Sequence, residues 1–258
     1  MFMFEAIAIA YFTALAAAAP FARPRGLDTW RGSLSSAAMG AAILAVTYTA
    51  PASVRLWFAH GYLVAGYWLP ALLVTGVTAG AFEAWLIGTE RWWQRWRIPL
   101  GPTAAYAFEL SYLLCYVLVP AAFIVVWVSG ATRDVERLWT AVLAAGFACY
   151  GTLPWLIARP PRALDEVGAR RRRAPTVTQQ ANLLVLSRVS HGHNTFPSGH
   201  VAVSIAAALM VLPVSRAAGV LMLVIAACIA AGATAGRYHY AIDVLLGAAI
   251  GVAASVLA

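Results

Sequence analysis

The pair of residues best suited to catalysis is His239 and Asp243, which are four positions apart near the end of the chain. On a helix this spacing places both side chains on one face, one turn apart. A carboxylate bonded to one imidazole nitrogen fixes the tautomer and leaves the other nitrogen as an oriented nucleophile or base. Asp243 also lies in an apolar stretch, where an unpaired carboxylate is costly. The pair therefore predicts a reaction centre, with a purely structural pair as the alternative.

A second set of candidates stands at Pro197-Ser198-Gly199-His200, where a polar connection gives way to an apolar run. Proline suits the start of a helix because its φ angle is preset. Ser198 and Gly199 let the first free N–H groups of the helix approach an anion, and the helix dipole favours negative charge there. His200 can give or take a proton near neutral pH. These residues predict a phosphate-binding helix start, with an interfacial helix start and an incidental histidine as the alternative.

Arginines supply the positive charge that a phosphate would need. Arg159 and Arg162 flank two prolines, and Arg237 stands two residues before His239. Guanidinium groups in such a turn can hold phosphate oxygens in bidentate fashion. A positively charged membrane flank explains Arg159 and Arg162 equally well when they are taken alone.

Four further residues are candidates for the wall of a substrate cavity: Arg188, His193, Glu109 and Tyr112. His191 and His193 have a spacing that occurs in metal sites, but no carboxylate or cysteine accompanies them, so we predict no metal and no cofactor. Glu109 and Tyr112 share one face of an apolar segment, where polar groups line a cavity or pack between helices.

Composition indicates that membrane-spanning helices position these residues. Apolar residues make up 62% of the chain and charged residues 11%, and the mean hydropathy is +0.76. Soluble domains contain about 45–50% apolar and about 25% charged residues. The net charge of +8 comes from arginine alone. In a membrane-embedded chain it points to anionic headgroups or a phosphate substrate rather than to nucleic acid.

We therefore predict an all-α, polytopic transmembrane bundle of about 6–8 spans, because a span needs about 20 mostly apolar residues. Eight segments qualify: 2–20, 34–52, 57–78, 104–129, 136–157, 198–213, 216–235 and 239–258. The stretch 80–103 mixes tryptophan with arginine, which is typical of a segment in the headgroup region. We expect N-terminal transmembrane helices over 1–56 and a catalytic membrane domain over 57–258, with its motifs within 150–258.

Taken in order, the three motifs resemble those of the type 2 phosphatidic acid phosphatase superfamily. Its signature is Lys-x6-Arg-Pro, then Pro-Ser-Gly-His, then Ser-Arg-x5-His-x3-Asp. The residues that match it position by position are Pro197, Ser198, Gly199, His200, His239 and Asp243. The first motif lacks its lysine and the third lacks its Ser-Arg, while Pro-Pro-Arg and Gly-Arg-Tyr-His-Tyr look like the branch of inositol phosphorylceramide synthases. The phosphate-binding arginines are accordingly chosen by proximity to the motifs.

The resemblance implies a six-helix core and a two-step displacement at phosphorus. His239 attacks to give a phosphohistidine, and His200 protonates the departing oxygen and then deprotonates the incoming water or alcohol. Arg159, Arg162, Arg237, Ser198 and Gly199 bind the phosphoryl group. The expected function is hydrolysis of a lipid phosphate or pyrophosphate, and the alternative is transfer of a phospho-headgroup to an alcohol acceptor. No oligomeric state is indicated.

A transporter or lipid-binding protein without turnover is the alternative of another class. Transporters show internal repeats or broken helices in matching halves, and the sequence shows neither. With eight spans, fourteen of the eighteen arginines fall on the side of the motifs, which favours the cytoplasm for that side. Most members of the family work on the opposite face. We expect a bacterial inner membrane protein with its site on the periplasmic face.

Overall fold

The computed structural model of the chain describes residues 1–18, 21, 27–74, 80–94, 101–168, 180, 184, 188, 190 and 192–258. For some helical residues, Glu109 among them, the side chain lies outside this description. Every regular element in the described part is a helix, which confirms the all-α prediction. An isolated antiparallel bridge joins Ala158 to Asn194.

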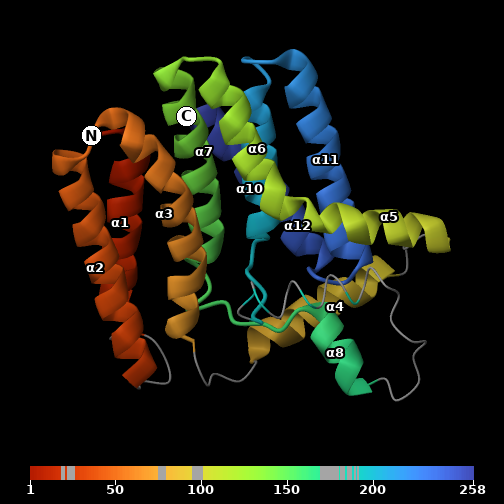
Figure 1. The fold of residues 1–258 in the computed structure, drawn as a ribbon. Coiled ribbons are helices and arrows are strands. Elements are labelled where there is room, and N and C mark those ends of the chain that lie inside the picture. Colours follow the sequence, from red (N-terminus) through yellow and green to blue (C-terminus); the bar gives the residue numbers. More distant parts are fainter. Residues whose placement is uncertain are drawn as a thin grey trace.

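Three N-terminal helices pack side by side at one edge of the molecule (Figure 1). They are α1 (Met3–Ala18), α2 (Leu27–Thr49) and α3 (Ala52–Leu72), and α1 and α3 both contact α7 (Thr132–Tyr150). The ring of Tyr11 on α1 stacks on Phe147 of α7 at 4.1 Å between centroids. These contacts attach the N-terminal helices directly to the rest of the bundle.

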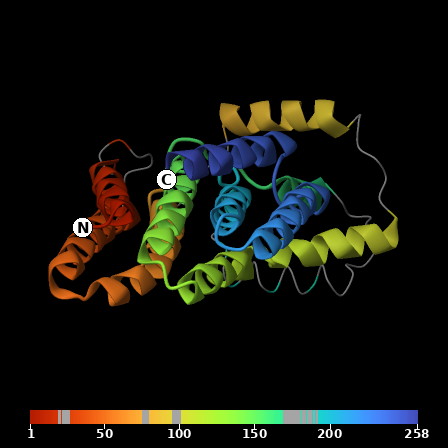
Figure 2. The same cartoon turned by 90° about the horizontal axis from the view of Figure 1, so that it is seen from above.

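Helix α10 (Gly199–Val211) lies at the centre of the C-terminal bundle (Figure 2). It contacts α6 (Cys115–Val128), α7, α11 (Arg216–Ala235) and α12 (Ala241–Leu257). Small residues allow close approach, since a Cβ added at Gly251 of α12 would stand 2.5 Å from the backbone oxygen of Ala202 on α10. Close packing of α10 therefore places its N-terminus beside that of α12.

Three helices lie across one end of the long helices, as Figure 1 shows: α4 (Ala81–Gln94), α5 (Pro102–Leu113) and α8 (Pro161–Gly168). The predicted interfacial stretch 80–103 thus contains a helix, α4. The predicted span 104–129 is divided, because α5 and α6 meet at Leu114 with a bend of 52°.

Among the described residues, α11 alone is both long enough and apolar enough to cross a bilayer as one helix, and the bent α5–α6 pair passes the same test together. The apolar helices α1, α10 and α12 are shorter, and the 13 residues of α10 span only about 20 Å. In α2, α3 and α7 the outer turns carry charged residues, including Arg31, Arg55 and Arg133. The number of spans stays a prediction.

Candidate active site

Backbone hydrogen bonds join the three motif segments to one another in pairs. The N–H of Asn194 donates to the carbonyl of Ala158 at 2.9 Å, and that of Arg162 donates to Arg237 at 3.0 Å. The N–H of Ser198 donates to the carbonyl of Asp243 at 3.1 Å. Segments that are far apart in sequence therefore meet in one place, at the end of the bundle covered by α4 and α8 (Figure 1).

The centre of the site is a buried histidine–carboxylate pair. The Nδ1 atom of His239 lies 3.1 Å from Oδ2 of Asp243, and these side chains are 6% and 0% exposed. The Nδ2 group of Asn194 donates to the same carboxylate oxygen at 2.7 Å. With Nδ1 directed at the carboxylate, the imidazole keeps Nε2 as the nitrogen that can act on a substrate.

The contact between His239 and Asp243 is present, but the helical register does not produce it. Helix α12 begins at Ala241, with Tyr240 in extended conformation as the N-cap residue. His239 thus precedes the helix, and its ring reaches the carboxylate in the first turn. The reason lies just upstream: Arg237 has a φ of 59°, and the N–H groups of Tyr238 and His239 both donate to the carbonyl of Ala233, which closes the end of α11.

The N-terminus of α10 faces this pair. Ser198 is the N-cap residue and is fully buried, and its hydroxyl oxygen has no hydrogen-bond partner among the described residues. Helix α10 therefore begins two residues after Pro197, at Gly199. A Cβ at Gly199 would lie 2.0 Å from the ring of Tyr150, so only glycine fits there. The first N–H groups of α10 and the hydroxyl of Ser198 could therefore bind an anion.

His200 lies across from His239 at a ring-centroid distance of 6.2 Å. Three tyrosine rings surround it, at 5.5 Å for Tyr116, 5.9 Å for Tyr67 and 6.0 Å for Tyr112. Two facing imidazoles beside a helix N-terminus can act on opposite sides of one phosphorus atom, one as nucleophile and one as acid or base.

Of the three predicted arginines, Arg162 packs against the segment that carries His239, and Arg237 belongs to that segment. The NH1 group of Arg162 donates to the hydroxyl of Tyr238 at 3.0 Å, and its guanidinium lies 5.2 Å from the centre of that ring. The ring of Tyr238 stacks in turn on Tyr112, 4.3 Å away. Arg237 lies 3.6 Å from a carboxylate oxygen of Glu90.

Arg159 is bound by Glu83 of α4. Its Nε and NH2 groups donate to the two carboxylate oxygens at 3.1 and 2.7 Å, and its backbone N–H adds a bond of 2.8 Å. These bonds, the side-chain bond foremost, lower the pKa of Glu83 and raise that of Arg159. A phosphate at Arg159 would therefore have to share the guanidinium with Glu83.

The comparison with family models fits this geometry. Residues 80–257 match the model of the PAP2 superfamily, which is well over half of the chain. The chain belongs to the PAP2 superfamily. The resemblance to type 2 phosphatidic acid phosphatases drawn from the three motifs is thereby confirmed at superfamily level, and the resemblance to one branch stays a prediction. Searches of curated proteins and of solved structures gave no match.

Membership of the PAP2 superfamily supports an activity of the phosphatase or phosphotransferase type. The matched region starts at α4, upstream of all three motifs. It therefore includes the glutamates of α4 that bind Arg159 and Arg237, namely Glu83 and Glu90.

The candidates for the cavity wall fall into three groups. Tyr112 is buried and lies beside His200, as just described. His193 is half-buried, next to Asn194, and burial lowers the pKa of its imidazole. Arg188 is exposed, and the side chain of Glu109 and the whole of His191 lie outside the described residues. Within that part of the chain no group of three or more histidine, cysteine or carboxylate side chains has metal-binding geometry.

Several residues of the candidate site were not predicted from the sequence. Asn194 binds Asp243, Glu90 and Glu83 bind arginines, and Tyr67 and Tyr116 flank His200. The sequence signals were weak: Asn194 stands in a histidine-rich string, and both glutamates lie in the tryptophan-rich stretch assigned to the membrane interface.

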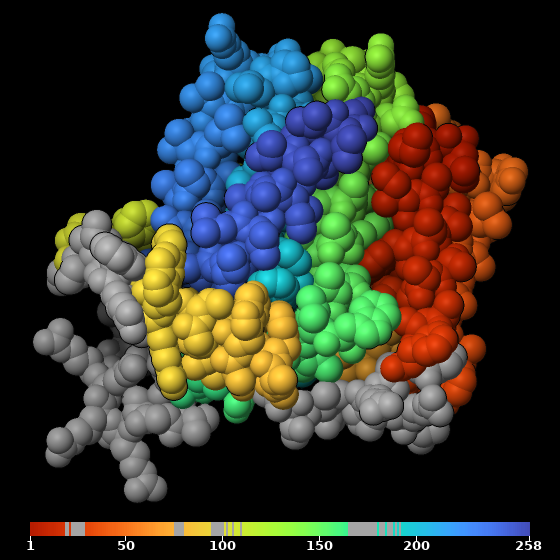
Figure 3. Space-filling model, turned by 180° about the vertical axis from the view of Figure 1, so that it is seen from behind, coloured from red at the N-terminus to blue at the C-terminus, as the bar shows by residue number. Residues whose placement is uncertain are grey.

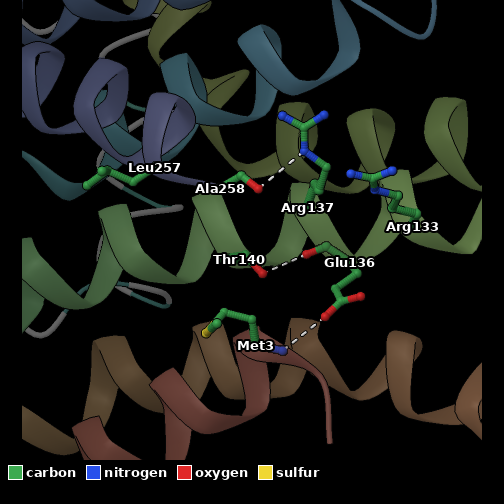
Figure 4. A pocket seen from close by; sticks show the side chains of 7 residues that line it. All are labelled: Met3, Arg133, Glu136, Arg137, Thr140, Leu257 and Ala258. Carbon is green, nitrogen blue, oxygen red and sulfur yellow. Dashed lines mark hydrogen bonds between the residues drawn. The ribbon is translucent and has the colours of Figure 1, made fainter.

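A cavity of about 420 Å³ lies at the other end of the bundle (Figure 4). It is lined by Met3, Arg133, Glu136, Arg137, Thr140, Leu257 and Ala258. None of the predicted site residues lines this cavity, so it is separate from the reaction centre.

Proposed function

We propose that the protein is a membrane-embedded phosphatase of lipid phosphates or pyrophosphates that works through a phosphohistidine at His239. The observation that carries the proposal is the buried arrangement in which Asn194 and His239 share one carboxylate oxygen of Asp243. A carboxylate in this position keeps a proton on Nδ1 and stabilises the cationic ring that forms when Nε2 bonds to phosphorus.

In the first step, Nε2 of His239 attacks phosphorus and the bond between phosphorus and the leaving oxygen breaks. His200 gives a proton to that oxygen, which departs as an alcohol or a phosphate. In the second step, water attacks phosphorus, His200 accepts its proton, and the phosphorus–nitrogen bond breaks. Inorganic phosphate is released and both histidines return to their starting states.

Positive charge and backbone N–H groups offset the charge on the phosphoryl oxygens during both steps. The proposed ligands are the N-terminus of α10 with Ser198 and Gly199, together with Arg162 and Arg237. We also include Arg159 as a proposed ligand, through the N–H groups that do not bind Glu83. Guanidinium groups suit this task because they remain charged and bind oxygens in pairs.

Composition and the helices that lie across the end of the bundle support a membrane location. The exposed tryptophans of α4, Trp85 and Trp92, suit the headgroup region. An acyl or prenyl tail would lie among the apolar helices while its phosphate reaches the site. As further proposals, residues 1–56 form accessory membrane helices, residues 57–258 form the catalytic domain, and the site faces the periplasm.

Transfer to an alcohol is the second candidate, and the rings around His200 favour it. In the second step His200 must deprotonate the incoming nucleophile, and its ring is surrounded by Tyr67, Tyr112 and Tyr116. An aromatic wall limits the approach of water and offers faces and hydroxyls to an organic acceptor. Only the identity of the second nucleophile distinguishes the two reactions.

The test is phosphate release from phosphatidic acid and from isoprenyl pyrophosphates by the protein purified in detergent, with His239→Ala as the control. We expect release by the wild type and none by the variant. Acid-labile labelling of His239 by a radioactive substrate would identify the intermediate. Release that persists in His239→Ala would contradict the proposal, and release that depends on an added alcohol would favour transfer.

A further inference from the structure

Helix α4 directs two glutamates toward the candidate site. Glu83 and Glu90 are seven residues apart and share one face of the helix, and both are buried, at 4% and 8% exposure. Trp85 and Trp92 lie on the other face and are exposed. Figure 3 shows α4 lying against the lower end of α12, where the two helices are in contact.

Glu90 binds the chain on both sides of His239. Its Oε2 atom accepts a hydrogen bond from the N–H of Ala241 at 3.2 Å, two residues after the histidine. Its Oε1 atom lies 3.6 Å from NH1 of Arg237, two residues before it. One carboxylate therefore connects both flanks of the segment that carries the proposed nucleophile.

The start of α12 needs this acceptor. Its N-cap residue, Tyr240, makes no side-chain capping bond, so no local side chain satisfies the first free N–H groups of the helix. A negative charge at a helix N-terminus is also favourable. Other hydrogen bonds that hold the segment from 237 to 241 run to Ala233, Arg162, Arg159 and Asp243, and none of these reaches the N–H of Ala241.

We propose that Glu90 is a positioning residue that fixes the distance and orientation of His239 relative to His200 and the N-terminus of α10. The proposal rests on the phosphohistidine mechanism proposed above. Glu90 contacts the backbone and an arginine rather than the reacting atoms, so it acts through His239. A displacement of about 1 Å in a catalytic group lowers a rate by on the order of 100-fold.

The kinetic test compares Glu90→Ala and Glu90→Gln with Glu136→Gln, a change on α7 at the other end of the bundle. Glu90→Ala should lower kcat on the order of 100-fold and leave KM within about threefold, because the nucleophile is displaced while Arg162 and the N-terminus of α10 remain as phosphate ligands. Glu90→Gln keeps an oxygen for the N–H of Ala241 and should recover about tenfold of that loss. Glu136→Gln should behave as the wild type.

Hydrogen–deuterium exchange tests the same idea without turnover. Glu90→Ala should speed exchange in the peptide that covers 237–243, Glu90→Gln should do so less, and Glu136→Gln should not. Unchanged exchange in Glu90→Ala, or a rise in KM in place of a fall in kcat, would overturn the positioning role. Absence of phosphate release by the wild type would contradict the phosphatase proposal, and exchange would still decide the role of Glu90.

Discussion

One carboxylate oxygen of Asp243 contacts two side chains of the candidate site. Oδ2 accepts from Asn194 and contacts Nδ1 of His239, whereas Oδ1 has no partner among the described residues. A fully buried carboxylate needs hydrogen-bond donors. When a donor is removed, the cost of burying the charge is no longer offset. Asn194 thereby restrains Asp243, and through it the ring of His239.

Replacing Asn194 should slow the reaction by disturbing this restraint. Asn194→Ala removes one donor, so we expect kcat to fall about tenfold with little change in KM. Asn194→Asp should be worse, because it places a second carboxylate beside Asp243. Steady-state kinetics in detergent provide the measurement, with Thr140→Ala on α7 as a control. Equal activity of all variants would show that Asp243 does not depend on Asn194.

The residues proposed to do the chemistry could be chosen from the sequence, but the residues that hold them in place could not. His200, His239 and Asp243 stand in short motifs with recognisable spacing. Asn194 is 49 residues from Asp243, Glu83 is 76 from Arg159, and Glu90 is 151 from Ala241. A single sequence contains no signal for such pairs, because only tertiary packing brings them together.

The pair of Glu83 and Arg159 should stabilise the protein in a pH-dependent manner. Since the pKa of Glu83 is lowered in the folded state, its contribution is present above the ordinary glutamate pKa of 4.5 and is lost as pH falls through the folded value. Glu83→Gln should lower Tm at pH 7 by about 1–3 °C. Thermal unfolding of both proteins should show this difference shrinking below about pH 4. A difference that grows on acidification would contradict the pairing.

At the scale of elements, the start of α10 depends on contacts that only a small residue permits. Gly199 lies against the ring of Tyr150, and a Cβ at Gly247 of α12 would stand 2.5 Å from the carbonyl oxygen of Ser198. The Pro-Ser-Gly-His motif thus serves packing in addition to the anion binding proposed for it. Its glycine brings the first turn of α10 into the space between α7 and α12.

Gly199→Ala should therefore displace the N-terminus of α10. We expect a loss of about 1–3 kcal/mol in stability from overpacking, together with a large loss of activity. Gly61→Ala on α3 is the matched control, since nothing lies within 4 Å of its Cβ position and alanine is the better helix former. Denaturation and phosphate release measure both effects. A Gly199→Ala protein with wild-type activity would contradict the packing role.

Sequence periodicity located the helices but misplaced several of their ends. The predicted last span starts at His239, whereas α12 starts at Ala241, because the turn after α11 uses Arg237 at positive φ. The predicted span 104–129 is two helices that bend at Leu114. Hydropathy is continuous across both places, so it does not show where backbone hydrogen bonding is interrupted.

At the scale of the whole molecule, the two termini lie at one end of the bundle and the candidate site at the other (Figure 1). In a membrane, this arrangement would require an even number of crossings. Among the described arginines, Arg91, Arg159, Arg162 and Arg237 lie at the end of the bundle with the site, whereas Arg55, Arg133 and Arg137 lie at the other end. Arg159, Arg162 and Arg237 are also the proposed phosphate ligands, so the proposed chemistry accounts for part of this grouping and membrane orientation need not account for all of it.

Thiol labelling tests this arrangement and the face on which the site lies. In a background in which Cys115, Cys149 and Cys228 are replaced by alanine, we would place single cysteines at Ser53 and at Arg91. Both positions are exposed, Ser53 at the start of α3 and Arg91 on α4 beside the site. We expect a membrane-impermeant reagent to label Arg91→Cys in intact cells, and Ser53→Cys only after the membrane is opened.

The reverse pattern would place the site in the cytoplasm, where the arginine distribution alone would put it. Hydrolysis of a water-soluble phosphate ester by intact cells is a second test of the face on which the site lies. A periplasmic site should hydrolyse an ester that is added outside the cells. Labelling of both cysteines from one side would mean an even number of crossings between residues 53 and 91. Such a result would contradict an arrangement in which α3 crosses the membrane once, because Ser53 on α3 and Arg91 on α4 lie at opposite ends of the bundle.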